Sequence, residues 1–208
     1  MKIKPSILLN VVLGASLLGV CTYTILQSSS KQDDNEDVVY NNIMTRTSIR
    51  SYDNKVIEDE KIDKLLHAGM AAPSAMNRQP WHFVVIKDKQ ILQQIAQLTP
   101  NSGMAKDAPL AIVTCGDMSK YKDDETKLRD FWVQDLSAAS ENILLQAHAM
   151  GLGAVWTGLY PSEERSNTIA KLLNLPQNLV PLNTIVIGYP KEDQQPKDKW
   201  NPENISYK

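Results

Sequence analysis

The feature that most constrains the fold is an alternation of short apolar runs with longer segments of helical periodicity. The short runs predict strands at residues 83–86, 110–115, 154–159 and 184–187. Apolar residues repeat every three or four positions in between, which predicts helices over 59–71, 88–98, 126–150 and 162–173, after a short helix at 38–45. Strands that alternate with helices favour an α/β or α+β sandwich around one sheet.

The ends and the middle of these helices carry further signals. Asp59, Asp88 and Ser162 are placed to cap helix starts, and Gly151 is placed to end the long helix. Small residues lie at the middle of that helix, at 137–140. They allow a close helix–helix approach, either inside the subunit or across a dimer.

Length and composition exclude several classes of protein. The 208 residues suffice for one domain with a full core, and a net charge of −2 with a pI near 5.9 does not favour nucleic acid as a partner. Two cysteines do not make a disulfide framework, and Cys115 lies in a run that predicts a buried strand. His67, His82 and His148 lack a metal-ligand spacing, which argues against a zinc enzyme.

The first 30 residues differ from the rest of the chain. Lys2 and Lys4 precede Ile7–Leu26, which contains no charged residue and has the layout of a secretory signal or a membrane-spanning helix. Acidic residues follow, so the lysines are expected to stay cytoplasmic. We expect a signal or membrane-anchor segment at 1–30, a solvated linker at 31–40 and a folded domain at 41–208.

Three fates of the N-terminal segment remain open. A cleaved signal peptide lacks a clear small-x-small site, and a lipoprotein signal at Cys21 has Val20 where a small residue is usual. The third is an uncleaved anchor. We expect the anchor or the lipoprotein, and hence an exported protein that faces the periplasm or the outside and contacts the membrane through this segment.

The first candidate for chemistry is Thr45–Tyr52. Alternate residues of an extended stretch point the same way, so Arg46, Ser48 and Arg50 could share one face. Guanidinium and hydroxyl groups together bind phosphate well. A solvated basic turn is the alternative for so short a motif.

Two further segments combine special backbone residues with neutral polar groups. Ala72–Trp81 holds two prolines with Ser74, Asn77 and Gln79, which suit an amide-rich heterocycle such as a flavin pyrimidine ring, although a polar turn is the alternative. Gly151–Gly158 contains a Gly-x-Gly that either ends a helix or lets backbone approach a planar ring. Lys197 and Lys199 matter only if the first segment binds a phosphate.

Taken in order, these segments resemble the nitroreductase family of FMN enzymes, over roughly 43–208. The most specific stretches are Pro73-Ser74-x-x-Asn77-x-Gln79-Pro80-Trp81 and Gly151-Leu152-Gly153-x-x-Trp156-x-Gly158, with Arg-x-Ser-x-Arg upstream. The resemblance implies an α+β three-layer sandwich with a central mixed sheet. It also implies a homodimer with two FMN molecules at the interface and a domain-swapped C-terminal arm.

The resemblance also implies a role for individual residues. Arg46 and Ser48 would hold the FMN phosphate and ribityl side, Arg50 would face the pyrimidine edge, and Lys197 and Lys199 would reach the phosphate. Ser74 and Asn77 would come from the other subunit, and Val155 and Trp156 would lie along the ring. The remaining residues implied at the cofactor are Thr47, Pro73, Gln79, Gly158 and, by a looser match, Asn101.

The function implied is transfer of a hydride from NAD(P)H to flat acceptors such as nitroaromatics or quinones, by a ping-pong mechanism in which the flavin carries the chemistry. No side-chain acid or base is needed, so no catalytic residue is named. Loops at 101–106 and 119–131 would select the acceptor. The alternatives are a tethered flavin-binding or scaffold protein without turnover, and a dehalogenase or flavin-processing relative on the same fold.

Overall fold

The computed structural model describes residues 35–121 and 130–208 of the chain. Thr45–Lys208 form one compact unit. Residues 35–45 are helical, which confirms the short helix predicted at 38–45 and extends it into the predicted linker. The segment 1–30 and Cys21 lie outside the described residues, so the predicted domain limits stay predictions.

The central sheet has four strands, all paired antiparallel. They are β1 (Trp81–Ile86), β2 (Leu110–Asp117), β3 (Gly153–Gly158) and β4 (Leu179–Gly188), in the order β1-β2-β4-β3. The α+β class is confirmed, but the sheet differs from the mixed one expected. β2 and β3 run in the same direction, yet β4 lies between them, so no two neighbouring strands are parallel. In the described part of the chain, parallel pairing is confined to an isolated bridge between Ser48 and Ala154.

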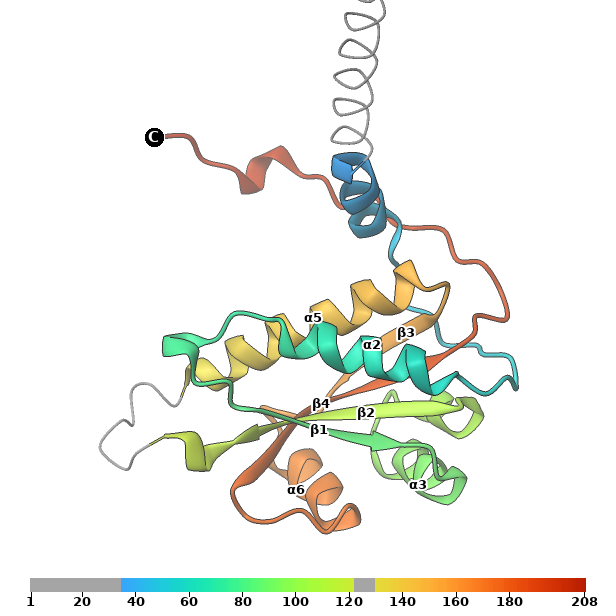
Figure 1. The fold of residues 1–208 in the computed structure, drawn as a ribbon, viewed down its shortest axis with the longest axis vertical. Helices are drawn as coiled ribbons and strands as arrows, with labels where there is room; N and C mark the ends of the chain where they lie inside the picture. The colour runs from blue at the N-terminus through green and yellow to red at the C-terminus, as the bar shows by residue number, and fades with distance from the viewer. Residues whose placement is uncertain (1–34, 122–129) are drawn as a thin grey trace, which may run out of the picture. The chain divides into compact units, whose positions relative to one another are not determined.

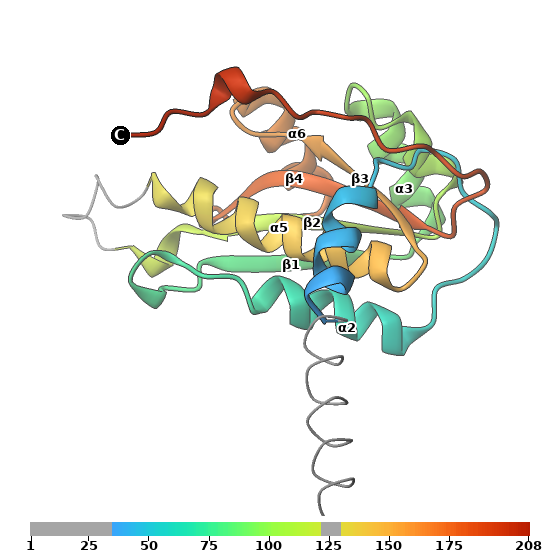
Figure 2. The same cartoon turned by 90° about the horizontal axis from the view of Figure 1, so that it is seen from above.

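Helices cover both faces of this sheet and make the expected three layers. α2 (Asp59–Met70) and α5 (Phe131–Ala149) lie on one face, and α3 (Lys89–Leu98) and α6 (Glu163–Leu172) on the other, as Figures 1 and 2 show. Side chains alternate along each strand, so Ile185 packs toward α2 and α5 while Val186 packs toward α3 and α6. The sheet therefore separates two apolar layers.

The predicted helix ends are mostly confirmed. The Asp88 carboxylate accepts from the backbone N–H groups of Gln90 and Ile91, at 2.8 and 3.0 Å, and Ser162 caps α6. At α2 the capping position is held by Glu58, one residue before the predicted Asp59, and it makes no side-chain cap bond. Gly151 follows α5 with a φ of 71°, the left-handed conformation that ends a helix.

Two of the four small residues of α5, Ala139 and Ser140, are fully buried inside the subunit, whereas Ser137 and Ala138 are half-buried. The buried pair fits one of the two predicted options, packing inside the subunit. On the facing helix, a Cβ at Gly69 would lie 3.0 Å from the Ile143 Cδ1 atom, and the Asn142 amide donates to the Ala68 carbonyl at 3.0 Å. Helices α2 and α5 therefore approach closely.

β4 is longer than the 184–187 predicted. It begins at Leu179, and Pro181 is tolerated inside it because it lies next to a break in the register with β2, where a missing N–H does little harm. Asn183 is tolerated inside the buried strand because its amide is bonded on both sides: Oδ1 accepts from the Thr114 hydroxyl at 2.9 Å, and Nδ2 donates to Ser140 at 2.8 Å.

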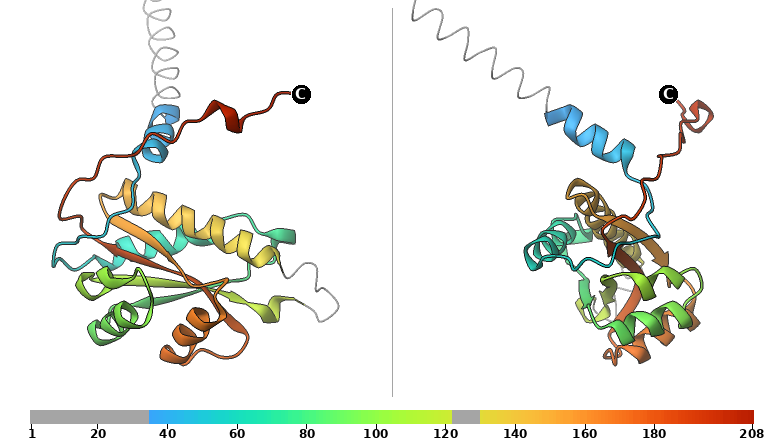
Figure 3. Two further views of the ribbon diagram at one scale, coloured as in Figure 1. Left: turned by 180° about the vertical axis from the view of Figure 1, so that it is seen from behind. Right: turned by 90° about the vertical axis from the view of Figure 1, so that its right-hand side faces the viewer.

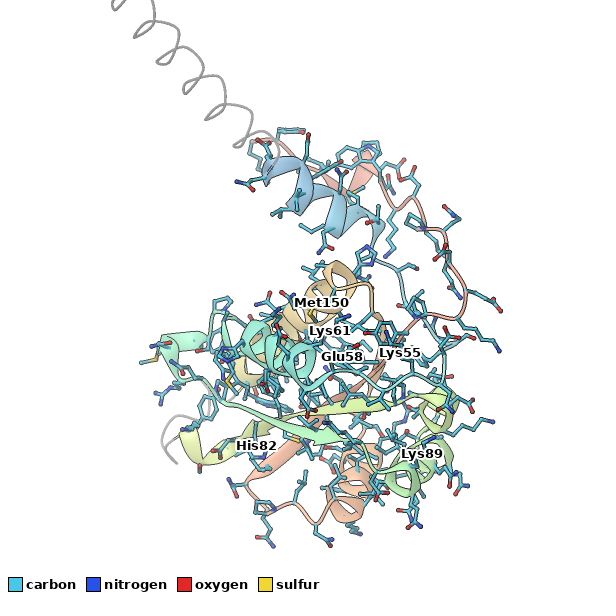
Figure 4. The ribbon with its side chains drawn as sticks, turned by 45° about the vertical axis from the view of Figure 1, so that its right-hand side comes forward. Lys55, Glu58, Lys61, His82, Lys89 and Met150 are labelled. Carbon is cyan, nitrogen blue, oxygen red and sulfur yellow. The ribbon has the colours of Figure 1, made fainter. Side chains whose placement is uncertain are left out.

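The C-terminal arm, residues 191–208, begins at a fixed point and then runs exposed. Tyr189 donates its hydroxyl hydrogen to Glu58 at 2.5 Å, and Lys55 and Lys61 lie 3.9 and 4.8 Å from its ring centre. Figure 4 labels Lys55, Glu58 and Lys61, which lie close together. Beyond this point the arm leaves the three layers (Figure 3), and Trp200 on it is 74% exposed. The extended tail predicted from the sequence is therefore confirmed.

Candidate functional site

The arginine-rich segment is held against the edge strand β3. Ser48 bridges to Ala154, and the Ile49 N–H donates to the Ala154 carbonyl at 3.1 Å. Tyr52 fixes the far end, because its hydroxyl donates toward the carbonyls of Ile49 and Val186 at 2.6 and 3.1 Å. Burial raises the pKa of Tyr52 far above its usual range, against a smaller opposing effect of the Arg50 charge, so this phenol stays a donor.

Glycine makes this attachment possible. A Cβ on Gly153 would lie 2.6 Å from Ile49 Cβ, and one on Gly188 would lie 2.8 Å from Tyr52 Cδ1. Gly151 ends α5, so the helix-end interpretation is confirmed for this glycine, whereas Gly153 begins β3 and accommodates Ile49. Gly158 is different, because a Cβ there would meet no atom within 4 Å. Gly151 also faces open space, but its left-handed φ explains that glycine, whereas Gly158 borders the pocket described next.

Where this segment meets β3, the structure forms a pocket of about 390 Å³. It is lined by Arg50, Pro100, Asn101, Val155, Trp156, Thr157, Gly158 and Arg165. Five of these residues were predicted from the sequence, from three segments far apart in the chain. The pocket therefore gathers part of the set of residues that the resemblance assigns to the flavin ring.

The pocket has one wall on the edge strand and positive charge beside it. Val155, whose side chain is buried, and the half-buried Trp156 line that wall from β3, and the guanidinium groups of Arg50 and Arg165 supply the charge. Within residues 35–121 and 130–208, neither guanidinium lies at ion-pair distance from a carboxylate. Asn101 contributes an amide from a left-handed position with a φ of 62°, which asparagine tolerates. Such a pocket suits a flat ring with an electron-rich polar edge.

Sequence reasoning missed Pro100, Thr157 and Arg165. Arg165 lies in the first turn of α6, where Ser162 accepts from its backbone N–H at 3.4 Å. A cation at a helix N-terminus is unfavourable, so its presence there was the one available signal of a role elsewhere. Thr157 is held by a hydrogen bond from its hydroxyl to the Thr184 carbonyl at 3.0 Å, and the sequence pattern did not mark it.

The predicted phosphate residues lie next along the same segment, outside the pocket lining. Arg46, Thr47 and Ser48 are half-buried, and Arg46 Nε lies 3.5 Å from a Glu141 carboxylate oxygen that is itself half exposed. The pKa of the nearby His148 is lowered, mainly by burial and to a smaller extent by the Arg46 charge. This end of the segment is therefore a second cationic position beside the pocket.

The loop at 73–79 lies elsewhere in the subunit, between α2 and β1. Its residues Pro73, Ser74, Asn77 and Gln79 do not line the pocket, and Asn77 and Gln79 both have left-handed backbone angles. Lys197 and Lys199, on the exposed arm, do not line it either. One chain therefore brings together only part of the predicted set.

Comparison with known proteins identifies the fold family. The model of the "Nitroreductase family" matches residues 43–102 and 97–189. A protein of Methanothermobacter thermautotrophicus named "Putative NADH dehydrogenase/NAD(P)H nitroreductase" is 45% identical over 163 residues, covering 78% of this chain and 83% of its own. A Bacteroides thetaiotaomicron crystal structure of the same name is 44% identical with a TM-score of 0.76, covering 82% and 96% of the two chains. A Desulfovibrio desulfuricans nitroreductase structure in complex with FMN is 31% identical with a TM-score of 0.70, over 82% and 96%.

These findings correct the predicted localisation. The archaeal relatives match 78% of the chain under enzyme names that carry no membrane or export term. No helix in the described ranges, 35–121 and 130–208, is long and apolar enough to cross a membrane. Measured against the archaeal relatives, the prediction of an exported, membrane-anchored or lipidated protein is wrong. It rested on an uncharged run of only the minimum spanning length, with no clear cleavage site and an atypical lipidation motif.

Sequence, fold and site geometry agree on the family. The family match covers nearly all of the compact unit, and the solved structures share its layers over more than four fifths of the chain. Two of the three motifs that first suggested the resemblance lie on β3 and on the segment attached to it, and the third is the loop between α2 and β1. The chain belongs to the nitroreductase family.

Proposed function

We propose that the chain is an FMN-dependent oxidoreductase that passes a hydride from NADH or NADPH to flat acceptors such as nitroaromatics or quinones. The observation that carries this proposal is the pocket on β3, where Arg50 and Asn101 lie beside Val155, Trp156 and the open space at Gly158. A solved relative is titled as a complex with FMN, and others are named as using NAD(P)H.

The pocket fits the ring of this cofactor by its chemistry. An isoalloxazine has two apolar faces and one edge of carbonyl and imide groups. The β3 wall suits a face, and the Arg50 guanidinium with the Asn101 amide suits the polar edge. Bound FMN would supply the capacity to accept and return a hydride, and the protein would bind, orient and tune it. Arg50 would stabilise negative charge on the pyrimidine edge of a bound flavin, which would favour the reduced cofactor.

The phosphate end of the cofactor fits the neighbouring segment. Arg46 and Ser48, with Thr47 between them, continue from Arg50 along the stretch that is fixed to β3. A phosphate would replace the half-exposed Glu141 as the partner of Arg46, since two phosphate oxygens make stronger charge-assisted bonds than one carboxylate at 3.5 Å. Lys197 and Lys199 would add charge from the arm.

The rest of the cradle comes from a second copy of the chain. The loop with Ser74 and Asn77 does not reach its own pocket, so in a symmetric homodimer it would serve the partner's pocket. The arm is exposed and carries Trp200, 74% exposed, and Tyr207, 92% exposed. Aromatic side chains on an extended arm are typical of contact with a partner. We therefore propose that the arm is domain-swapped.

Mixing two defective variants tests the shared site. Arg50→Ala damages the pocket side, and Asn77→Ala damages the side donated by the partner. If the subunits mix at random, half of the dimers are hybrids with one intact site each, so about one site in four regains tight FMN binding. If mixing restores no binding, both halves of the site belong to one chain.

Kinetics test the reaction and its alternatives. NADH and NADPH oxidation by the full chain is followed at 340 nm with a nitroaromatic or a quinone as acceptor. Turnover with parallel double-reciprocal plots supports the ping-pong exchange of donor and acceptor in one slot. Flavin binding without turnover would favour the scaffold alternative, and halide release from a halophenol would favour the dehalogenase. Acceptor choice is assigned to loops 101–106 and 119–131, of which 122–129 lie outside the described residues.

A further inference from the structure

The loop that ends at β1 is strained. Met76, Asn77 and Gln79 have φ values of 52°, 54° and 50°, which non-glycine residues rarely adopt. Such a backbone persists only where its surroundings determine it, and this is common at ligand sites. Inside the loop, the Gln79 N–H donates to the Ser74 hydroxyl oxygen at 3.0 Å, and the Gln79 amide donates to Asn77 Oδ1 at 3.0 Å. The loop thus tethers the two residues that the proposed function assigns to the partner's flavin.

One carboxylate fixes this loop from another element. Asp135 lies on α5 and is 5% exposed. Its Oδ1 accepts from the Ala75 N–H at 2.9 Å, at the start of the short helix η1 (Ala75–Asn77). Its Oδ2 is buried and has no partner in the described part of the chain. A carboxylate that is buried at this cost needs a compensating role, because burial of a charge is expensive unless it is bonded.

We propose that Asp135 is a positioning residue, whose carboxylate holds the Ser74–Gln79 loop in the conformation that presents Ser74 and Asn77 to the flavin. This inference rests on the proposed function. Asp135 acts through the Ala75 N–H, so it need not touch the cofactor. The N–H···O bond to a charged carboxylate is stronger than one to a neutral acceptor, which gives the loop a dependence on the charge of Asp135.

The groups around Asp135 leave its titration distinct. Burial raises the pKa of Asp135, and the Ala75 bond opposes that rise. Tyr121 faces Asp135 from the turn after β2. Burial, and to a smaller extent the Asp135 charge, raise the pKa of Tyr121 to about 12, so this phenol stays neutral at acidic and neutral pH. Arg78 lies 5.5 Å from the Tyr121 ring centre, and its charge partly opposes the rise in the Tyr121 pKa. His82 on β1 is exposed.

Other carboxylates near the same elements are separately bound or exposed. Asp117, at the end of β2, accepts from Ser119 and Asn178, which contributes to a lowered pKa despite its partial burial. Glu141 on α5 pairs with Arg46, and Asp130, the residue before α5, is exposed. A raised Asp135 pKa therefore predicts that FMN affinity falls as the pH drops through it, since protonation removes the charge that strengthens the Ala75 bond.

The test compares Asp135→Ala, Asp135→Asn and the control Asp130→Asn in the full chain. FMN dissociation constants are measured from pH 4.5 to 8 by quenching of flavin fluorescence, and the exchange rate of the Ala75 amide is measured in the apo-protein. We expect Asp135→Ala to weaken FMN binding about tenfold, as for loss of a charge-assisted hydrogen bond, and to speed Ala75 exchange. Asp135→Asn, which keeps a neutral acceptor, should bind FMN at pH 8 with an affinity between those of the wild type and Asp135→Ala. The FMN phosphate titrates in this pH range in every variant, so the contribution of Asp135 is the part of the wild-type pH dependence that Asp135→Asn lacks. Asp130→Asn should match the wild type.

Two results overturn the inference. One is a pH profile of FMN affinity for Asp135→Asn that superimposes on that of the wild type across the acidic range. This comparison tests the inference even if Asp135→Ala fails to fold. The other is unchanged Ala75 exchange with unchanged FMN affinity in Asp135→Ala. A wild-type chain that takes up no FMN refutes the proposed function and the flavin role of Asp135 together, whereas the Ala75 exchange rates still test the contact to the loop.

Discussion

Adding one methyl group at Gly153 should dislodge the segment that carries the cationic residues. The new Cβ would lie 2.6 Å from both Cβ and Cγ2 of Ile49. Carbon atoms need about 3.5 Å, so the segment must move by about 1 Å. Ile49 Cβ sits on the backbone, so no rotation of the side chain relieves this contact. The strain of such overpacking costs about 1–3 kcal/mol, and the lower entropy of the unfolded alanine chain offsets about 0.4–1 kcal/mol of it.

Gly158→Ala is the matched control for Gly153→Ala. Both glycines lie on β3, but a Cβ at Gly158 meets no atom within 4 Å. At equal protein concentration, thermal unfolding of the apo-protein should show Gly153→Ala melting about 2–8 °C below the wild type and Gly158→Ala at or slightly above it. Displacement of Arg46 and Arg50 should also weaken FMN binding by Gly153→Ala. A Gly153→Ala protein that melts with the wild type and binds FMN as tightly would refute the packing of Ile49 against β3.

Three further substitutions test the charges at the site. Arg46→Gln should weaken FMN binding by about 2 kcal/mol through loss of a phosphate contact. It should also raise the pKa of His148, because the Arg46 charge contributes to lowering that pKa. Fluorescence titration measures the FMN affinity and NMR the His148 pKa, and if neither changes, Arg46 is not a phosphate contact. Arg50→Ala should lower the flavin reduction potential by about 30 mV, the equivalent of about 1.4 kcal/mol in a two-electron couple, and a potential equal to the parent's removes Arg50 from the pyrimidine edge. Arg165→Gln should shift the potential in the same direction, since both guanidiniums line the pocket, and spectroelectrochemistry that finds no shift would place Arg165 outside the field of the ring.

The sequence predicted those parts of the fold that depend on local physics. Asp88 and Ser162 cap helices because short polar side chains there satisfy backbone N–H groups, and that preference is visible in the residues themselves. The extent of β4 was not visible. Pro181 and Asn183 argue against a buried strand, and only the register break and the hydrogen bonds from Thr114 and to Ser140 make them acceptable.

The candidate site divides in the same way. Arg50, Val155 and Trp156 could be placed at one pocket because their motifs resemble a known family. Arg165 and Asp135 stood outside every motif, and their significance depends on contacts that only the fold creates. The sequence did contain one signal for Asp135, since an ionisable residue on the buried side of a helix is rare without a partner. Its partner, the Ala75 N–H, lies 60 positions away in the chain.

Titration of the purified full chain with FMN and with riboflavin tests the central claim most directly. We expect a yellow protein that holds one FMN per chain and releases it on denaturation, with riboflavin bound more weakly because it lacks the phosphate. A natively folded protein that stays colourless in excess FMN, or that binds riboflavin as tightly, would contradict the assignment of the β3 pocket and its cationic segment to this cofactor.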